Sequence, residues 1–189
     1  MTKRDPELAA YTRHFKKEQE CEDLDAFLRA YARATGEELG IEDCGESPDF
    51  ICRRADGSLI GVELTQIRRS PEQARWEAIL DYQDEMRPGE TSDEIDRLVL
   101  KKAELKKKFR IQRNILMLAL RESDFDLAVR LSMNIPLEDL ETTGFEEIWL
   151  ADFKGIWDGA HREAMLFGLY PEEYRYVTER SMFDQKPYG

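Results

Sequence analysis

The stretch SPDFICRRADGSLIGVELTQI, residues 47–67, places two acidic residues in segments that are otherwise apolar. It predicts two short strands, residues 49–54 and 59–67, joined by Asp56-Gly57, a dipeptide typical of β-hairpin turns. Asp49 begins the first strand and Glu63 interrupts the second. Because a buried carboxylate without a partner is costly, each of these acids needs a compensating group.

The length of the hairpin loop decides whether the two acids meet. If Asp56 and Gly57 alone form the turn, Asp49 pairs with Leu64, and the acids lie on opposite faces of the hairpin. If residues 55–57 form the loop, with Gly57 left-handed in a bulge, Asp49 lies directly opposite Glu63. Directly opposed residues have Cβ atoms about 4.5–5.5 Å apart, so two carboxylates there repel unless a positive group separates them.

Two kinds of positive partner satisfy this requirement. A divalent cation held between the acids is one, and hard oxygen ligands suit Mg²⁺ or Mn²⁺. In the other, Asp49 caps the strand entry after Pro48, and Glu63 pairs with Arg53 or Arg54. The first describes a metal site, and the second describes ordinary structural ion pairs.

Pro48-Asp49 followed by Glu63-Leu64-Thr65 resembles the paired motifs of the PD-(D/E)XK nuclease superfamily, with Thr65 where that family has lysine. The resemblance covers about residues 18–120. It implies an α/β fold with a restriction-endonuclease-like core, in which helices flank a mixed sheet. It also implies Mg²⁺- or Mn²⁺-dependent hydrolysis of phosphodiester bonds, with Asp49 and Glu63 as catalytic metal ligands. The missing lysine puts hydrolysis in question, because that residue is thought to orient the attacking water.

A lysine on a neighbouring helix is one replacement for the side chain absent at Thr65. In the predicted helix that begins near Thr91, Lys102 falls at the centre of an apolar stripe, and Lys106 lies within about 50° of it. The superfamily is known to relocate its lysine onto this helix, so Lys102 or Lys106 is a catalytic candidate. Both lysines also fit an amphipathic helix whose lysine stems cover apolar surface.

The resemblance further implies a third acid from the N-terminal helix. Glu20 lies on the same stripe as Leu24, Phe27 and Tyr31, so it is the candidate catalytic and metal-binding residue there. Other acids stand nearby in the sequence, namely Glu18, Glu22 and Glu46.

The segment KKAELKKKFRIQR, residues 101–113, contains seven basic residues and one acid in a chain whose net charge is −12. Because phosphate contacts supply much of nucleic-acid affinity, this local patch is the candidate surface for a nucleic-acid partner, with DNA as the commoner substrate in the family. It also fits a solvated face or a contact with the protein's own acidic surface. The expected nucleic-acid contacts are Lys101, Lys107, Arg68 and Arg69.

The chain has 189 residues, which predicts one domain, with a core of about residues 18–120 and a C-terminal elaboration, 121–189. Helices alternate with two hairpin strands, a fully buried strand and a later strand, and this order is typical of an α/β domain with a mixed sheet. The predicted helices span 6–35, in one or two pieces, 71–86, 91–109 and 124–141; the later strands span 114–120 and 145–153.

The remaining composition excludes several classes of protein. No segment approaches the roughly 18 apolar residues of a membrane span, and the N-terminus lacks the apolar core of a signal peptide. Cys21, Cys44 and Cys52 are odd in number and lack CxxC spacing, which predicts a reduced, cytoplasmic protein with neither a disulfide framework nor a zinc site.

The sequence therefore predicts a metal-dependent nuclease, and the alternative is a nuclease-fold protein that no longer cuts and serves as a binding or assembly module. No DNA-reading module is recognisable. A homodimer or a targeting protein partner is therefore expected to direct any cleavage.

Overall fold

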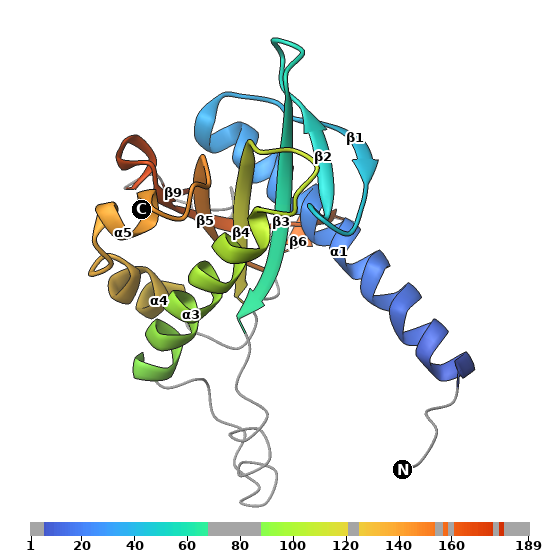
Figure 1. The fold of residues 1–189 in the computed structure, drawn as a ribbon, viewed down its shortest axis with the longest axis horizontal. Coiled ribbons are helices and arrows are strands. Elements are labelled where there is room, and N and C mark those ends of the chain that lie inside the picture. Colours follow the sequence, from blue (N-terminus) through green and yellow to red (C-terminus); the bar gives the residue numbers. More distant parts are fainter. Residues whose placement is uncertain are drawn as a thin grey trace, which may run out of the picture.

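The chain forms an α/β fold around one mixed sheet in the computed structural model, which describes residues 6–67, 88–120, 125–153, 157–158, 161–175 and 178–179 (Figure 1). The predicted helix 71–86, together with Arg68 and Arg69, lies outside these residues. The helical elements are α1 (Pro6–Thr35), α3 (Pro88–Lys106), α4 (Phe125–Ser132), α5 (Leu137–Glu141) and the 3₁₀ turn η1 (Glu172–Tyr174).

The main sheet has seven strands in the order β1-β2-β3-β4-β5-β8-β9. Strands β3, β4 and β5 are parallel, whereas β2 and β8 run antiparallel to their neighbours β3 and β5. Strands β6 and β7 form a separate pair. The strands are β1 (Gly40–Cys44), β2 (Phe50–Arg53), β3 (Leu59–Ile67), β4 (Asn114–Leu120), β5 (Glu147–Asp152), β6 (Trp157–Asp158), β7 (His161–Arg162), β8 (Met165–Tyr170) and β9 (Thr178–Glu179).

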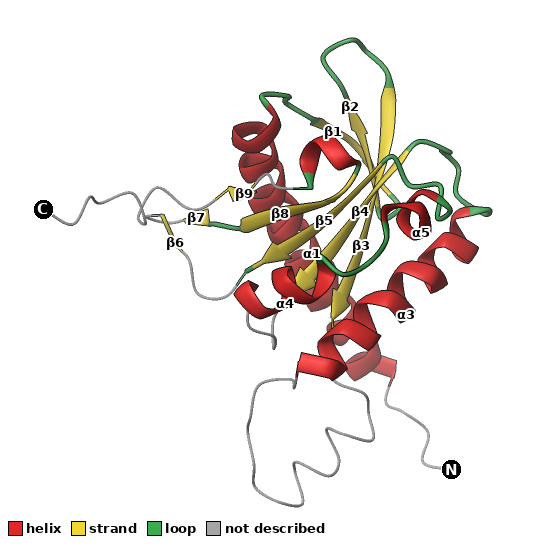
Figure 2. Cartoon of the chain, turned by 90° about the vertical axis from the view of Figure 1, so that its left-hand side faces the viewer, coloured by secondary structure: helices red, strands yellow, loops and turns green. Residues whose placement is uncertain are grey.

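Helices cover both faces of the sheet, as Figure 2 shows. On one face α1 packs Leu24, Phe27 and Tyr31 against the sheet, as their spacing predicts. On the other face α3, α4 and α5 contribute a second cluster that includes Ile95 and Leu140. All seven residues of β4 are buried, which is expected of a strand covered on both faces. The predicted α/β class, with helices flanking a mixed sheet, is confirmed.

The hairpin between β2 and β3 has the three-residue loop. Arg53 pairs with Leu59, and the N–H of Arg54 donates to the carbonyl of Ser58 at 2.9 Å, so residues 55–57 form the loop. Gly57 has φ of 85°, a left-handed conformation that favours glycine. The loop therefore sets the register in which Asp49 and Glu63 share one face.

Several helices and strands differ from the prediction. Strand β1 was not predicted, because its five residues are all exposed and show no apolar alternation. Helix α3 begins with Pro88 at its first position, so the predicted start near Thr91 lies inside the helix. The predicted helix 124–141 is two helices, and Pro136, which has no N–H to donate, directly precedes the second.

None of the helices in the described part of the chain combines the length and the apolar character that a membrane span requires.

Candidate active site

Asp49 and Glu63 face each other at the start of the hairpin. Phe50 pairs with Val62, so continuing the register by one residue places Asp49 opposite Glu63. The main-chain N–H of Asp49 donates to Glu63 Oε2 at 3.3 Å, and the N–H of Leu64 donates to Asp49 Oδ2 at 2.9 Å. Glu63 is only 4% exposed. The sheet thus holds two carboxylates together in a largely desolvated position.

Helix α3 supplies the positive charge beside this pair. Alternation along β3 points Glu63 to the same face as Ile67, which belongs to the cluster under α3. The Lys102 ammonium forms an ion pair with Glu63 Oε1, and its side chain is 17% exposed. Arg53 and Arg54 instead pair with Glu42 and Glu37, so the alternative in which either arginine pairs with Glu63 is wrong.

Lys106, the other candidate lysine on α3, makes different contacts. Its ammonium donates to the main-chain carbonyl of Gly144 and lies 5.7 Å from the centre of the Phe145 ring. Burial lowers the pKa of Lys106, and the charge of Glu146 opposes this effect. Of the two lysines, Lys102 is the one that the structure brings to Glu63.

Both carboxyl groups of the pair are harder to ionise than in water. Burial raises the pKa of Asp49, and the charge of Glu20 raises it further, against the Leu64 N–H and the charges of Lys102 and Lys17. Burial also raises the pKa of Glu63, and the charge of Asp49 is the second cause of this increase. Lys102 lowers the pKa of Glu63 and only partly offsets these two effects. The two ionised acids therefore cost the folded state free energy that an additional cation would recover.

We expect Asp49→Asn to raise the free energy of unfolding at neutral pH by about 1 kcal/mol. Asparagine keeps an oxygen for the Leu64 N–H but removes the buried charge. Because the folded-state pKa of Asp49 lies above its unfolded value, the folded protein takes up the proton first as the pH falls. Wild-type stability relative to the variant should therefore increase as the pH falls through the raised pKa.

Urea denaturation at several values between about pH 7 and pH 4 measures this difference. The difference in the free energy of unfolding between Asp49→Asn and wild type should become smaller toward acid pH. The matched control Asp25→Asn removes an exposed acid on α1 and should change stability by no more than about 0.5 kcal/mol. A gap that widens toward acid pH would contradict the assigned direction of the shift.

Glu20 lies near this pair but does not join it. It is 9% exposed, and its Oε1 is 3.1 Å from Lys16 Nζ on the same helix. Its charge contributes to the raised pKa of Asp49. Within the described ranges, no group of three His, Cys, Asp or Glu side chains is arranged to hold a metal ion. The role of Glu20 as a third metal ligand stays a prediction.

The two acids of the hairpin have the donor chemistry that a magnesium or manganese ion requires. Magnesium is commonly held by one or two carboxylates and completes its shell with water and substrate oxygens. Asp49 and Glu63 supply two such carboxylates. Burial raises the pKa of both groups, and the charge of Asp49 raises the pKa of Glu63 further. Lys102 is the group that shares Glu63 with such an ion.

Three chain segments pack closely together beside the paired acids. A Cβ atom on Gly61 would lie 2.0 Å from Asn114 Oδ1 and 2.6 Å from Pro48 Cγ. Asn114 is fully buried and donates through Nδ2 to the Ile111 carbonyl at 2.6 Å. The absence of a side chain at Gly61 thus lets Pro48, which precedes Asp49, and the start of β4 pack against β3.

The basic segment 101–113 is partly occupied by internal contacts. Lys102 and Lys106 make the contacts described above. In addition, Arg110 Nη1 lies 3.3 Å from Asp43 Oδ2, and Arg113 Nε lies 2.5 Å from Glu146 Oε1. The other basic residues of the segment are exposed, namely Lys101, Lys107 and Lys108. Lys101 and Lys107 thus remain available for the predicted nucleic-acid contact.

A buried polar cluster on the opposite face was not predicted from the sequence. Glu147 on β5, 4% exposed, accepts hydrogen bonds from Tyr31 at 3.0 Å, Trp149 at 2.9 Å and Arg54 at 2.8 Å. Arg54 also pairs with Glu37. Burial, followed by the charge of Glu147, raises the pKa of Tyr31. The acid at the start of an apolar strand was the available signal, but Tyr31 and Arg54 come from distant segments.

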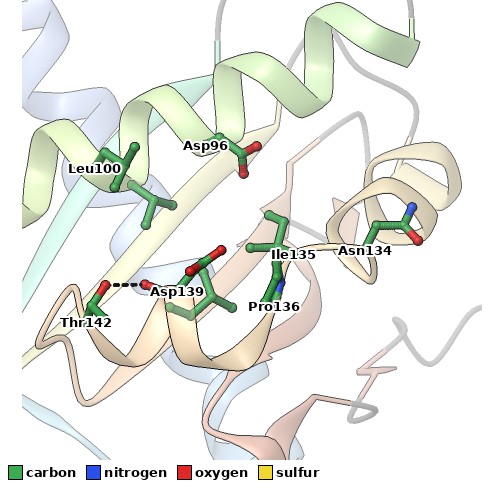
Figure 3. A pocket seen from close by; sticks show the side chains of 9 residues that line it. Asp96, Leu100, Asn134, Ile135, Pro136, Asp139 and Thr142 are labelled. Carbon is green, nitrogen blue, oxygen red and sulfur yellow. Dashed lines mark hydrogen bonds between the residues drawn. The ribbon is translucent and has the colours of Figure 1, made fainter.

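A cavity of about 430 Å³ lies beside α3 and contains none of the predicted site residues. Figure 3 shows Asp96 and Leu100 of α3 on one side and Ile135, Pro136 and Asp139 on the other. The hydroxyl of Thr142 donates to the Asp139 carbonyl at 2.7 Å and so fixes one end of the lining. This cavity is separate from the Asp49–Glu63 pair.

Comparison with protein-family models, with curated proteins and with solved structures finds no match to this chain.

Proposed function

We propose that the chain is a divergent PD-(D/E)XK-like nuclease with a restriction-endonuclease-like core, which hydrolyses phosphodiester bonds of DNA with Mg²⁺ or Mn²⁺. The observation that carries the proposal is the Asp49–Glu63 pair beside Lys102. The pair is opposed across the hairpin, and the lysine reaches Glu63 from another element.

The position of Lys102 supports hydrolysis despite the threonine at position 65. A lysine two residues after Glu63 would emerge from the same strand and the same face. Lys102 approaches that face from α3 and ends at the Glu63 carboxylate. It therefore brings an ammonium group to the acids without a lysine in the strand.

In the proposed mechanism, Asp49 and Glu63 would hold the cation through carboxylate oxygens. When bound, the ion supplies a water of lowered pKa and positive charge against the phosphodiester. Lys102 orients the attacking water and stabilises negative charge on the pentacovalent phosphate. The Leu64 N–H holds Asp49 in place, and no protein nucleophile is required. Exposed Lys101 and Lys107 would contact the phosphate backbone.

We expect Lys102→Met to lower the cleavage rate by roughly a hundredfold, which is typical of removing one group that stabilises charge in the transition state. Lys106→Met is the matched comparison, since it removes a lysine from the same helix whose ammonium contacts Gly144 rather than Glu63. Cleavage rates at saturating Mn²⁺ should separate the two variants. Equal losses in both would contradict the assignment of Lys102.

The alternative is a nuclease-fold protein that binds or assembles without cutting. Lys102 already balances one charge of the pair, and Arg110 and Arg113 are used in internal ion pairs. This alternative predicts DNA or protein binding without metal-dependent cleavage.

Incubation of plasmid and single-stranded DNA with the purified chain tests the proposal. Cleavage should appear with Mg²⁺ or Mn²⁺ and disappear with a chelator. DNA binding without cleavage under any of these metal conditions would favour the alternative.

A further inference from the structure

Three cysteines that are far apart in the sequence come together at one edge of the fold. Cys21 lies on α1, Cys44 ends β1 and Cys52 lies in β2. Cys21 and Cys44 are both exposed and interact electrostatically, and partial burial, followed by the charge of Cys44, raises the pKa of the Cys21 thiol. The spacing of the cysteines in the sequence could not indicate this contact, because it joins a helix to an edge strand.

A second set of contacts places the same turn of α1 over the same end of β1. Lys17, one helical turn before Cys21, donates to the Gly45 carbonyl at 3.2 Å. Its ammonium also lies 4.9 Å from the centre of the Phe50 ring, and Phe50 is the strand partner of Cys44. The approach of Cys21 to Cys44 is thus fixed by neighbouring residues on both elements.

Cys52 is the less suitable partner for Cys44. Because Cys44 pairs with Phe50, Cys52 is its diagonal neighbour on β2, and such neighbours are typically about 7–8 Å apart. Disulfides need Cα atoms closer than this. Cys52 is also fully buried, and burial raises the pKa of its thiol to about 11.

We propose that Cys21 and Cys44 are a modification site that forms a reversible intramolecular disulfide, with a small-molecule disulfide as the oxidant. One protein thiolate attacks the oxidant and forms a mixed disulfide, releasing one small thiolate. The second protein thiolate attacks the protein sulfur of that bond and releases the other small thiolate. Two protein thiols are oxidised, and one small disulfide is reduced to two thiols.

The bond would tether α1 to the edge strand and close a loop from residue 21 to residue 44. Closing such a loop restricts the unfolded chain and stabilises the folded state. The proposal does not depend on nuclease activity, since it concerns only the two thiols and their elements. Inside a cell, the Cys21–Cys44 bond would form or break according to the ratio of thiols to disulfides around the protein.

The full-length protein is incubated with oxidised glutathione, alkylated, and analysed by intact mass and peptide mapping. We expect a monomer lighter by two hydrogen atoms, with Cys21 and Cys44 in one cross-linked peptide and Cys52 alkylated only after denaturation. Cys21→Ser and Cys44→Ser should each abolish the internal bond. Cys52→Ser is the matched control and should retain it.

Oxidised wild type should also unfold at a higher denaturant concentration than reduced wild type, and this shift should be absent in Cys21→Ser. A bond mapped to Cys52, only glutathione adducts, or only bonds between chains would overturn the proposal. An unchanged or lower midpoint of the oxidised protein would do the same, because it would show that the bond does not fit the native fold.

Discussion

Glu63→Gln is expected to reduce metal-dependent DNA cleavage by roughly a thousandfold or more. A catalytic cation contributes several kcal/mol to the transition state, and each 1.36 kcal/mol is about tenfold in rate. Glutamine keeps the size of the side chain and an oxygen for the Asp49 N–H, but it removes the charge that pairs with Lys102 and that the proposed cation would also need. The loss should therefore appear in cleavage while the fold persists.

Glu42→Gln is the matched control for this experiment. Glu42 lies on β1 in an exposed pair with Arg53, where its Oε1 is 2.6 Å from Arg53 Nε. It is the same substitution within the same sheet, away from the paired acids. Cleavage time courses with both variants and circular dichroism of each separate a site effect from a folding effect. Wild-type rates in Glu63→Gln would contradict the assigned role of Glu63.

Arg54→Met is expected to have the largest effect on stability, a loss of about 3–5 kcal/mol in the free energy of unfolding. Arg54 lies between Glu37 and Glu147, and the arginine side chain is 13% exposed. Without the guanidinium, Glu147 keeps hydrogen bonds from Tyr31 and Trp149 but has lost its charged partner. Removing one partner of a buried ion pair leaves an uncompensated charge, which is more costly than the pair is stabilising.

Arg53→Met, at the adjacent position, provides the comparison. Arg53 pairs with Glu42 at the surface, and exposed pairs of this kind contribute about 0–1 kcal/mol. Urea denaturation of both variants measures the difference. Similar small losses at the two positions would show that the Glu147 cluster does not stabilise the fold as its burial implies.

The local features of the site could be predicted because they depend on short-range rules. Asp56-Gly57 indicated the turn, and counting from a three-residue loop gave the pairing of Asp49 with Glu63 that the structure contains. The position of Lys102 on the apolar stripe of its helix indicated that it points inward. Lys106 could not be separated from it, because its contact with Gly144 depends on a loop far along the chain.

Features that depend on tertiary contacts could not be predicted in this way. Strand β1 has no apolar alternation, since all of its residues are exposed, and only its pairing with β2 identifies it. Arg54 and Glu147 are 93 residues apart in the sequence, so neither position indicates the other. The contact of Cys21 with Cys44 has the same origin.

Calorimetric titration with Mn²⁺ tests most directly whether Asp49 and Glu63 share a cation. Wild type is expected to bind one ion per chain. Glu63→Gln should lose this binding, Glu42→Gln should retain it, and Lys102→Met should retain or strengthen it because a competing positive charge is removed. Absence of Mn²⁺ binding by wild type, or equal binding by wild type and Glu63→Gln, would contradict the account.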